Sequence, residues 1–558
     1  MKYMKIGIGQ LQLHPENIQF HWEQIIQIIH EAKAAGTQLL LFPAFSVTGY
    51  LPNDITLFPD FYEDCQKIHE KIIQLAKDIT IIWGSIIYQP QKLTPAVFIA
   101  QNQKLLFSTM TNTIYPLTID KETITLSICQ EERAPKEKIA SKADLTLVFY
   151  QTPGTLLSSA KAEPETIIVP VPTLYLRNEG LAYSGKQIFV CPGKSQYILP
   201  QTKQVFTVPK GNIGYFSLED IMNHQEAHVL PIENIYQRTI EGIRLFMKYS
   251  HLSKVVIGLS GGIDSALNAC LYQQALGAEN VFLVNMPSRY NSHLTQNLAR
   301  DLSSKLGCAY GIFPIEDSVQ QTINQLENTP FWRNGKRFHL TVSSFTGENI
   351  QARDRGSRLL AAIAQSIGGV FTANCNKTEI TVGYATMYGD QAGFLAATGN
   401  LWKYEVYDLA RYIDKVIYQT PVLAPIIDLK PSAELSPAQD ITKGLGDPLI
   451  YSYHDKLFSA WEDRKIPLSL GEILLAYREN RLGKELGCEE HIITENFPNI
   501  EVFIRDLEKW WKAYQGMATV KKLQSPPVLI VHNPPRNENM TRVQSPYYSE
   551  TYSKIKQL

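Results

Sequence analysis

The clearest hydrophobic pattern in the chain is an apolar, β-branched run, Val255, Val256 and Ile257, followed by small residues and then by a helical pattern. This order predicts a buried strand, a turn over residues 258–265 and a helix that begins near Ala266. The next segment, NVFLVNMPSRYNSHLTQNLARDLSSKLG, predicts a strand, a loop and a second helix. Strands that alternate with helices predict an α/β fold with a doubly wound parallel sheet, which binds ligands at the carboxyl ends of its strands.

The N-terminal part of the chain has a different pattern, in which strands and helices alternate at first and short paired strands dominate later. This predicts an α-β sandwich with paired sheets. A segment punctuated by glycine and proline follows and predicts a linker. We expect an N-terminal domain at 1–204, a linker at 205–222, a second domain at 223–529 and a loosely packed tail at 530–558. The first domain is expected to have strands at 6–13, 37–50, 79–88, 96–99, 123–129 and 144–150, and a helix at 16–35.

Composition narrows the classes of function. With 558 residues and 44% hydrophobic positions, the chain is expected to be globular and to hold two or more domains. Its 53 basic and 54 acidic residues leave no excess charge for nucleic acid or a membrane, so we expect neither partner. The N-terminus alternates like a strand and does not resemble a signal peptide, so we expect a cytoplasmic protein. The seven cysteines are scattered without C-x-x-C spacing, which supports neither a zinc site nor a disulfide framework.

The turn at 258–265 has the chemistry of a phosphate-binding loop. Gly261 and Gly262 let the backbone approach an anion closely, Ser260 and Ser265 offer hydroxyl groups, and the next helix points its free N–H groups to the same place. Asp264 would repel a phosphate unless a divalent cation lay between them, which indicates Mg²⁺. The loop lacks the lysine of a Walker-type loop, so we expect cleavage at the α-phosphate with release of pyrophosphate. The alternative is a glycine-rich turn with serine caps in an ordinary αβ unit.

The loop SGGIDS resembles the pyrophosphate loop of the ATP pyrophosphatases, a superfamily that includes GMP synthetases, asparagine synthetases, argininosuccinate synthetases and NAD synthetases. Three further segments, GENIQARDRG, NCNKTEITVGYATMYGD and KPSAELSPAQD, resemble the matching segments of the NAD synthetases. This resemblance implies ATP and deamido-NAD as substrates, Mg²⁺ as cofactor, and a homodimer or higher homo-oligomer. Asn374 and Cys375 depart from the threonine and glycine of the family, a change at the expected contact with the ATP ribose or adenine.

The resemblance also implies roles for single residues. Asp264 and Glu379 would hold Mg²⁺, and Lys403 would bind the ATP phosphates, so these three are the expected catalytic residues. From the residues alone, Glu379 could instead be an acid at a helix N-terminus, stabilised by the helix dipole. The implied ATP-binding residues are Gly258, Ser260, Gly261, Gly262, Ile263, Asp264, Ser265, Met286, Asn374, Lys403 and Ser432. The implied deamido-NAD-binding residues are Asn349, Arg353, Glu379, Tyr384, Thr386 and Lys521, the last on an expected basic strand at 518–527.

The N-terminal segments LLLFPAFSVTGYLPNDI, ITLSICQEE and YSGKQIFVCPGK resemble the nitrilase-type amidase domain, an α-β-β-α sandwich that supplies ammonia in glutamine-dependent NAD synthetases. That family cleaves an amide with a glutamate, a lysine and a cysteine. Here Ala44 occupies the place of the glutamate, the segment 107–116 contains no lysine, and Cys129 alone matches the nucleophile. A thiol without its base is mostly protonated at neutral pH, so we expect an inactive amidase domain. In the alternative, Glu131, Glu132 or Lys104 replaces the missing partners.

The function expected from these observations is that of an ammonia-dependent NAD synthetase. The nicotinate carboxylate of deamido-NAD would attack the α-phosphate of ATP, and ammonia would then displace AMP from the acyl carbon. Three alternatives remain: a glutamine-dependent enzyme with a functional site around Cys129, a non-catalytic nucleotide sensor, and another ligase of the superfamily such as a GMP synthetase. The pair Asp264 and Glu379 argues against the sensor, and the segments YATMYGD and PSAEL argue against the GMP synthetase.

Overall fold

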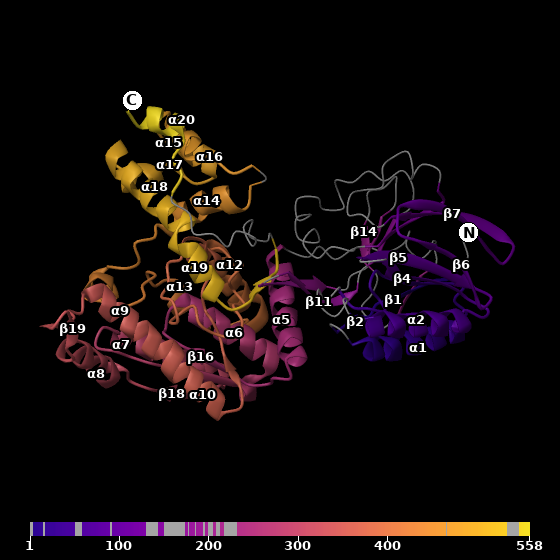
Figure 1. The fold of residues 1–558 in the computed structure, drawn as a ribbon, viewed down its shortest axis with the longest axis horizontal. Coiled ribbons are helices and arrows are strands. Elements are labelled where there is room, and N and C mark those ends of the chain that lie inside the picture. The colour runs from indigo at the N-terminus through magenta and orange to yellow at the C-terminus, as the bar shows by residue number, and fades with distance from the viewer. Residues whose placement is uncertain are drawn as a thin grey trace. The chain divides into compact units, whose positions relative to one another are not determined.

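The computed structural model describes residues 4–14, 17–50, 59–89, 92–129, 143–149, 173–176, 178–184, 186–192, 196–198, 205–207, 213–216, 231–464, 466–532 and 546–557. The chain divides into two compact units (Figure 1). The first comprises residues 1–184 and 188–230, and the second comprises residues 185–187 and 231–558. Among the described residues, each helix is too short or too polar to cross a bilayer.

The first unit is built on two six-stranded sheets. Their central strands are buried along their whole length, as the runs LLLF and LTLVF show, because both faces of these strands are covered. The first sheet has the order β15 (Ile213–Phe216), β1 (Ile6–Gly9), β3 (Leu39–Phe42), β4 (Thr80–Gln89), β5 (Lys92–Gln101) and β6 (Lys104–Thr109). The second has the order β14 (Val205–Thr207), β13 (Gln196–Ile198), β10 (Thr173–Leu176), β9 (Leu145–Phe149), β8 (Glu122–Cys129) and β7 (Thr113–Ile119). The short strands β2 (Gln12–Leu13), β11 (Glu179–Ser184) and β12 (Gln187–Pro192) lie side by side in a third sheet.

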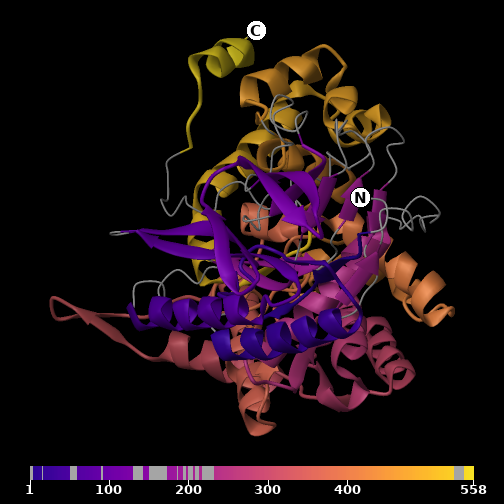
Figure 2. The same cartoon turned by 90° about the vertical axis from the view of Figure 1, so that its right-hand side faces the viewer.

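Helices α1 (Ile18–Ala34) and α2 (Pro59–Leu75) lie next to each other and pack on the first sheet (Figure 2). Their apolar positions recur with helical spacing, so each helix buries one face: Ile25, Ile28 and Ile29 in α1, and Ile68 and Ile72 in α2. The hydrophobic pattern of α2 was not recognised in the sequence, nor were those of β6 and β7.

The segment 205–222 differs from the linker that its glycines and its proline predicted. Residues 205–207 form β14 and pair with β13, and residues 213–216 form β15 and pair antiparallel with β1, with Ile6 opposite Phe216. The short runs VFT and IGYF each have the residues of a strand. This part of the chain therefore contributes strands to the first unit.

The second unit centres on a four-stranded parallel sheet in the order β18 (Ala309–Ile312), β17 (Val281–Asn285), β16 (Val255–Gly258) and β21 (Val370–Phe371). This is the predicted parallel sheet, with helices on both faces (Figure 1). Val256, Val284 and Leu360 belong to the core on one face, and α6 packs on the same two central strands. The helices of this part are α5 (Pro231–Tyr249), α6 (Ile263–Leu276), α7 (His293–Leu306), α8 (Glu316–Asn328), α9 (Ser344–Arg353), the π-helical turn η6 (Asp354–Leu360), α10 (Ala361–Ser366), α11 (Lys377–Val382), α12 (Lys403–Tyr412), the π-helical turn η7 (Ile413–Tyr418) and α13 (Ala424–Ile427).

The rest of the second unit is helical and has its own core of aromatic and aliphatic residues. Two expectations are wrong here. The expected basic strand at 518–527 is instead helix α19 for most of its length, because ATVKKLQ has helical spacing of its apolar residues. The end of the expected loose tail is helix α20, whose Tyr552 is 1% exposed and packs in this core. The helices are α14 (Tyr451–Glu462), α15 (Leu470–Arg478), α16 (Leu482–Leu486), α17 (Glu490–Asn496), α18 (Ile500–Gln515), α19 (Met517–Gln524) and α20 (Glu550–Gln557).

Candidate active site

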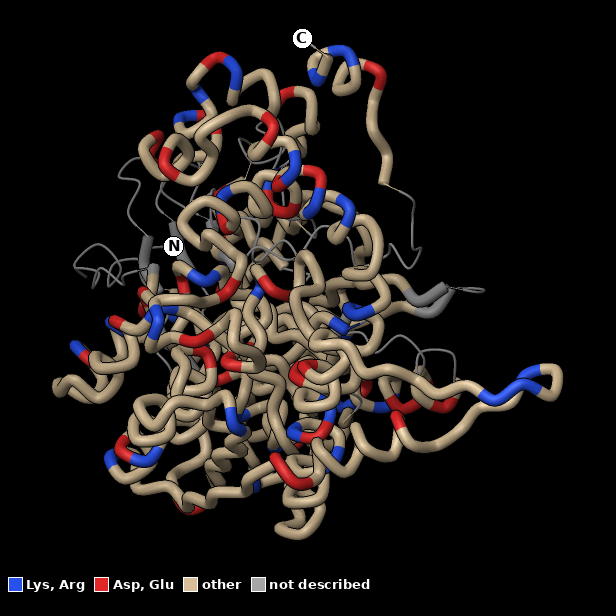
Figure 3. Tube along the Cα trace, turned by 90° about the vertical axis from the view of Figure 1, so that its left-hand side faces the viewer, with Lys and Arg blue, Asp and Glu red and all other residues tan. Residues whose placement is uncertain are grey.

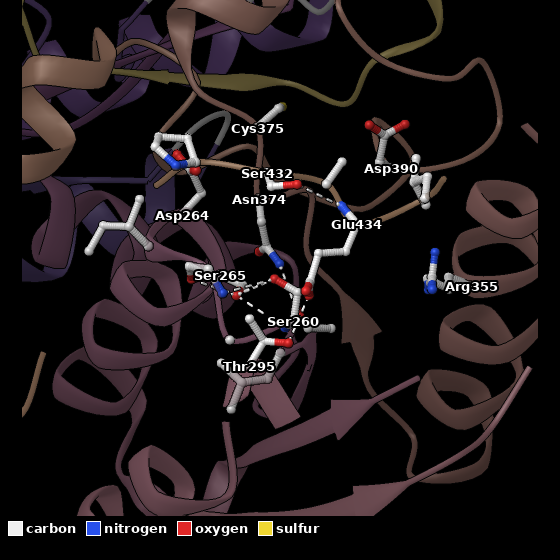
Figure 4. Close-up of a pocket in the computed structure, with 18 of the residues that line it drawn as sticks. Ser260, Asp264, Ser265, Thr295, Arg355, Asn374, Cys375, Asp390, Ser432 and Glu434 are labelled. Atoms are coloured by element: carbon white, nitrogen blue, oxygen red, sulfur yellow. Dashed lines mark hydrogen bonds between the residues drawn. The ribbon is translucent and has the colours of Figure 1, made fainter. Parts of the chain in front are cut away.

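The loop between β16 and α6 has the geometry of a phosphate cradle (Figure 4). Gly261 has a φ of +90°, and a Cβ there would lie 2.2 Å from the carbonyl oxygen of Thr295, so the position requires glycine. The hydroxyl group of Ser265 accepts from the Ser260 N–H at 3.2 Å and donates to the Gly262 carbonyl at 3.0 Å. No side chain caps the N-terminus of α6 at Gly262. The first N–H groups of this helix are therefore placed to bind an anion.

Three charged side chains from three helices meet beside the cradle: Asp264 of α6, Glu379 of α11 and Lys403 of α12. The Lys403 ammonium contacts Oδ2 of Asp264, and the Asn376 side-chain amide donates to Oδ1 at 2.9 Å. Burial, and then the charge of Asp264, raise the pKa of Glu379 well above its ordinary value. Burial by itself would lower the pKa of Lys403, but Asp264 and Glu379 together raise it, so this ammonium group stays charged.

The two carboxylates fit a magnesium ion that shares its coordination with a nucleotide. Among the described residues, no group of three or more His, Cys, Asp or Glu side chains is placed to hold a metal alone. Mg²⁺ commonly binds one or two carboxylates and completes its shell with water and phosphate oxygens, so Asp264 and Glu379 beside a phosphate cradle suit it. Glu379 also accepts from the Asn376 N–H at 3.4 Å in the capping box of α11. Glu379 therefore has both features: it caps the N-terminus of α11, as the sequence alone allowed, and it lies near Asp264.

A loop at 430–447 covers the cavity, and its position is fixed by a buried carboxylate. Glu434 accepts from the Ser292 N–H at 3.2 Å and from the Thr295 hydroxyl at 2.7 Å, which ties the loop to the start of α7. Its φ of +46° lies in the left-handed region, so these bonds hold a residue that is not glycine in an uncommon conformation. The Ser432 hydroxyl donates to the Gln439 carbonyl at 2.6 Å inside the loop.

The cradle, the charged cluster and the covering loop surround one cavity of about 290 Å³. Every expected ATP-binding residue lines this cavity, and so do Glu379 and Tyr384 from the expected deamido-NAD set. Asn374 donates to the Gly258 carbonyl at 3.1 Å and accepts from the Thr372 hydroxyl at 2.7 Å. Cys375, the second departure from the family pattern, lines the same cavity as a buried thiol whose pKa is raised by burial.

The other expected deamido-NAD residues lie outside this lining. Three of them surround the loop that follows α11: Arg353 donates to the Met387 carbonyl at 3.1 Å, the Thr386 N–H donates to Asp390 at 2.7 Å, and Lys521 donates to the Gly383 carbonyl at 2.6 Å. Tyr384 of the same loop connects this cluster to the cavity. Asn349 lies one helical turn before Arg353 and donates to the Phe345 carbonyl at 2.7 Å.

Several residues of the site escaped the analysis of the sequence. Asn376, which binds Asp264, lies in the recognised segment NCNKTE but was given no role, and Asp447, whose pKa is raised by burial, belongs to no recognised segment. Asp390 lines the cavity, and burial raises its pKa too. Arg355 belongs to the segment GENIQARDRG, but the sequence assigned it no role, and only the structure shows that it lines the cavity.

The positions compared with an amidase site lie in the first unit. Ala44 follows β3, is 5% exposed, and its carbonyl accepts from the Asn178 side chain at 3.0 Å. Cys129 ends β8, is 1% exposed, and its sulfur lies 3.6 Å from the Ser127 hydroxyl. Lys104 is exposed at the start of β6. Glu131 and Glu132 lie outside the described residues.

Comparison with known proteins gives a family for the second unit. Residues 235–474 match the model of the NAD synthase family. The glutamine-dependent NAD(+) synthetase of Acinetobacter baylyi is 27% identical over 515 residues, which cover 81% of this chain and 88% of that protein. The enzyme of the same name from Rhodobacter capsulatus is 37% identical over 211 residues, which cover 37% of each chain.

Two solved structures show the same fold over nearly the whole chain. The glutamine-dependent NAD+ synthetase of Acinetobacter baumannii, solved with ADP, has a TM-score of 0.64 at 22% identity and covers 98% of both chains. That of Cytophaga hutchinsonii has a TM-score of 0.70 at 15% identity and covers 99% of both. The expected α/β fold, a nitrilase-like sandwich followed by the parallel sheet of the ATP pyrophosphatases, is confirmed. Residues 235–474 thus match the NAD synthase family, and the chain is similar to glutamine-dependent NAD(+) synthetases along most of its length.

Proposed function

We propose that the second unit converts deamido-NAD to NAD by way of an adenylate, with consumption of ATP and release of AMP and pyrophosphate. The observation that carries this proposal is the meeting of Asp264, Glu379 and Lys403 beside the phosphate cradle in one cavity. The cavity has no need of a nucleophilic side chain, because the carboxylate of the substrate is itself the nucleophile. Binding of ADP in the synthetase of A. baumannii supports an adenine nucleotide as ligand.

The chain's own residues position the nucleotide and balance its charge. The N–H groups at the start of α6 and the loop around Gly261 hold the β- and γ-phosphates, which depart together as pyrophosphate. Lys403 is the cation that stabilises the charge growing on this leaving group, for which its ammonium must turn from Asp264 toward the phosphates. Asp264 and Glu379 would hold Mg²⁺, which when bound neutralises phosphate charge and orients the α-phosphate for in-line attack.

The Arg353 cluster is the proposed binding surface for deamido-NAD. Arg353, Thr386 and Lys521 all contact the loop that follows α11, and Tyr384 extends from this loop into the cavity. Two cationic side chains at this loop suit a ligand with two phosphate groups. A dinucleotide bound here would reach the α-phosphate of ATP with its nicotinate end at Tyr384.

Release of pyrophosphate from ATP tests this function directly. We expect release only when deamido-NAD is present, and we expect an adenylate to accumulate when no nitrogen donor is supplied. Mass spectrometry of the quenched reaction would identify the adenylate. Cleavage of ATP to ADP and inorganic phosphate, or equal release of pyrophosphate without deamido-NAD, would contradict the proposal.

The nitrogen donor is a second proposal, and the comparisons change the initial expectation. The relatives that match along most of this chain are named glutamine-dependent. These names favour glutamine as a nitrogen donor over the initial expectation that the enzyme uses ammonia alone. We therefore propose that glutamine serves, with Cys129 as nucleophile. The buried methyl group of Ala44 cannot accept a proton, so this proposal requires another base near Cys129. Free ammonia remains the species that attacks the adenylate in either case.

The rate of NAD formation, measured with glutamine or with ammonium chloride in the wild type and in Cys129→Ala, tests whether Cys129 releases ammonia from glutamine. We expect Cys129→Ala to abolish NAD formation from glutamine and to leave the rate with ammonium chloride within about twofold of the wild type. Cys65→Ala, another buried thiol of the first unit, is the matched control and should leave both rates unchanged. A wild-type protein that uses ammonium but not glutamine would contradict this proposal and indicate an inactive amidase domain.

We also propose that the chain assembles as at least a dimer, as the family resemblance implies. The segment 331–345 supports an interface, because Trp332 is 68% and Phe345 is 73% exposed. The hairpin formed by β19 (Phe331–Arg333) and β20 (Lys336–Phe338) projects from the second unit with a cationic tip (Figure 3). Sedimentation equilibrium tests the state of assembly, and a monomer at micromolar concentration would contradict it.

A further inference from the structure

Arg355 is placed in the cavity by an unusual turn of helix. It lies in the π-helical turn η6, between α9 and α10. Gly356 packs against the loop that follows α11, and a Cβ there would lie 2.4 Å from the Gly389 carbonyl oxygen. Asp354 binds Arg358, with Nε to Oδ1 at 2.6 Å, on the outer side of the turn. A wider turn held by such close contacts directs one arginine inward, as π-helical turns often do at functional sites.

The guanidinium group of Arg355 is anchored on two sides. Its Nε donates to the Met286 carbonyl at 3.0 Å, and its Nη2 donates to Oδ1 of Asn291 at 3.0 Å. Asn291 also accepts from the Ser288 N–H at 2.9 Å, so the arginine secures the loop after β17. Within the described residues, Nη1 has no acceptor from the chain. This third nitrogen belongs to a side chain that lines the cavity, opposite Ser265 (Figure 4).

The surroundings of Arg355 suit the nucleoside part of a nucleotide. The cradle follows β16, and β17 is the neighbouring strand, so a triphosphate held in the cradle can extend its nucleoside toward Met286. Val284, Met286 and Leu360 provide apolar surface there for a flat base. Burial lowers the pKa of Arg355 to about 10, against the charges of Asp354, Asp390 and Glu434, and the group remains a cation at neutral pH.

On the basis of the function proposed above, we infer that Arg355 contacts ATP on its base and ribose side and thereby sets the affinity for the nucleotide. The guanidinium group offers an N–H to an acceptor nitrogen of the base or to a ribose oxygen, and its planar face can stack on the base. Arg353, two residues earlier, points instead to the Met387 carbonyl and to the other cluster. The two neighbouring arginines thus serve different ligands.

Isothermal titration calorimetry tests this inference by measuring the affinity of the full chain for three ligands. The probes are Mg-ATP, pyrophosphate with Mg²⁺, and deamido-NAD. We expect Arg355→Met to weaken Mg-ATP about tenfold to a hundredfold, the usual effect of losing a hydrogen bond to a charged group. Binding of pyrophosphate should change less than twofold, because the cradle does not include Arg355. Arg355→Lys keeps the charge without the planar fork and should recover only part of the affinity.

Arg358→Lys is the matched control, since Arg358 lies on the same helical turn with its side chain 49% exposed and pairs with Asp354. It should bind all three probes as the wild type does. Equal weakening of Mg-ATP and pyrophosphate in Arg355→Met would indicate a distorted cradle and overturn the inference. Unchanged binding of Mg-ATP, or weakening confined to deamido-NAD, would also overturn it. A wild-type chain that binds no ATP would instead contradict the proposed function itself.

Discussion

Both carboxylate oxygens of Asp264 already have partners from the chain, the Lys403 ammonium and the Asn376 amide. An isolated charge at this depth would be costly, and Lys403 offsets that cost while the cavity holds no cation. The same ammonium is the group proposed to receive the pyrophosphate. At the scale of residues, we therefore propose that Mg²⁺ replaces Lys403 as the cation beside Asp264 when a magnesium nucleotide binds.

This arrangement predicts a severe effect of Asp264→Asn. The amide would lose the charge that holds both Lys403 and the proposed magnesium ion, so we expect deamido-NAD-dependent release of pyrophosphate to fall about a hundredfold or more. Asp301→Asn, on the exposed side of α7, is the matched control and should behave as the wild type. Thermal unfolding would verify the fold of both variants. Retained turnover in Asp264→Asn would refute the metal assignment.

At the scale of elements, Glu434 connects the covering loop to α7. The carboxylate accepts two hydrogen bonds across 139 or more residues of sequence, from Ser292 and Thr295. A hydrogen bond to a charged group contributes about 1.5–3 kcal/mol to stability. The Gln351 side chain also donates to the Leu435 carbonyl at 2.9 Å, so Glu434 is one of the side chains that hold the loop over the cradle.

We predict that Glu434→Gln loosens this loop and raises the KM for ATP about tenfold, with a smaller change in kcat. The amide keeps one acceptor atom, so one of the two bonds is lost. Hydrogen exchange of peptides from 430–447 would report faster opening. Lys443→Gln, on the exposed side of the same loop, should change neither quantity. Unaltered exchange and KM in Glu434→Gln would show that the loop is held by other contacts.

The contact of α2 with the first sheet predicts a dependence of stability on pH. His69 is buried against Phe98, with ring centroids 4.5 Å apart, and its Nε2 lies 2.8 Å from the Ser85 hydroxyl. Burial lowers the pKa of His69 to about 4, and burial also lowers that of His21 in α1 to about 4. Because the folded state favours neutral histidine, this stability is complete above pH 6.5 and is lost as the pH falls from 6.5 toward 4.

Between pH 7.5 and pH 5 we expect a loss of about 2 kcal/mol for each of these histidines in the free energy of unfolding of this unit. Native-state hydrogen exchange of peptides from α2 and β4, corrected for the intrinsic effect of pH, would measure it. His69→Phe removes one titrating group and should show about half the loss. An equal loss in the variant and the wild type would mean that His69 is not the group that titrates.

How far the sequence predicts an element depends on what determines that element. The β16–α6 segment was predicted well because its buried strand, glycines and helix all agree at a single place in the chain. The residues 518–527 were assigned to a strand by resemblance, against their own helical spacing. The segment 205–216 carries turn signals, and only pairing with other strands, such as that of 213–216 with β1, shows that 205–207 and 213–216 are strands. Arg355 reaches the site because it lies on a π-helical turn, and no pattern in the neighbouring sequence predicts such a turn.

At the scale of the whole molecule, the proposed chemistry divides between the two units. The described residues that line the cavity all belong to the second unit, and the proposed adenylation is assigned to this unit. The first unit holds Ala44 and Cys129, and the role proposed for it is the supply of nitrogen. The two questions can therefore be answered by separate measurements, one with ammonium and one with glutamine.

We propose that this chain makes NAD in the cavity of its second unit. The most direct test of this proposal is the formation of NAD by the purified chain from ATP, deamido-NAD, Mg²⁺ and ammonium chloride, with all products measured. The account predicts NAD, AMP and pyrophosphate in equal amounts, and loss of all three in Asp264→Asn. Absence of NAD under these conditions, or ADP in place of AMP, would contradict it.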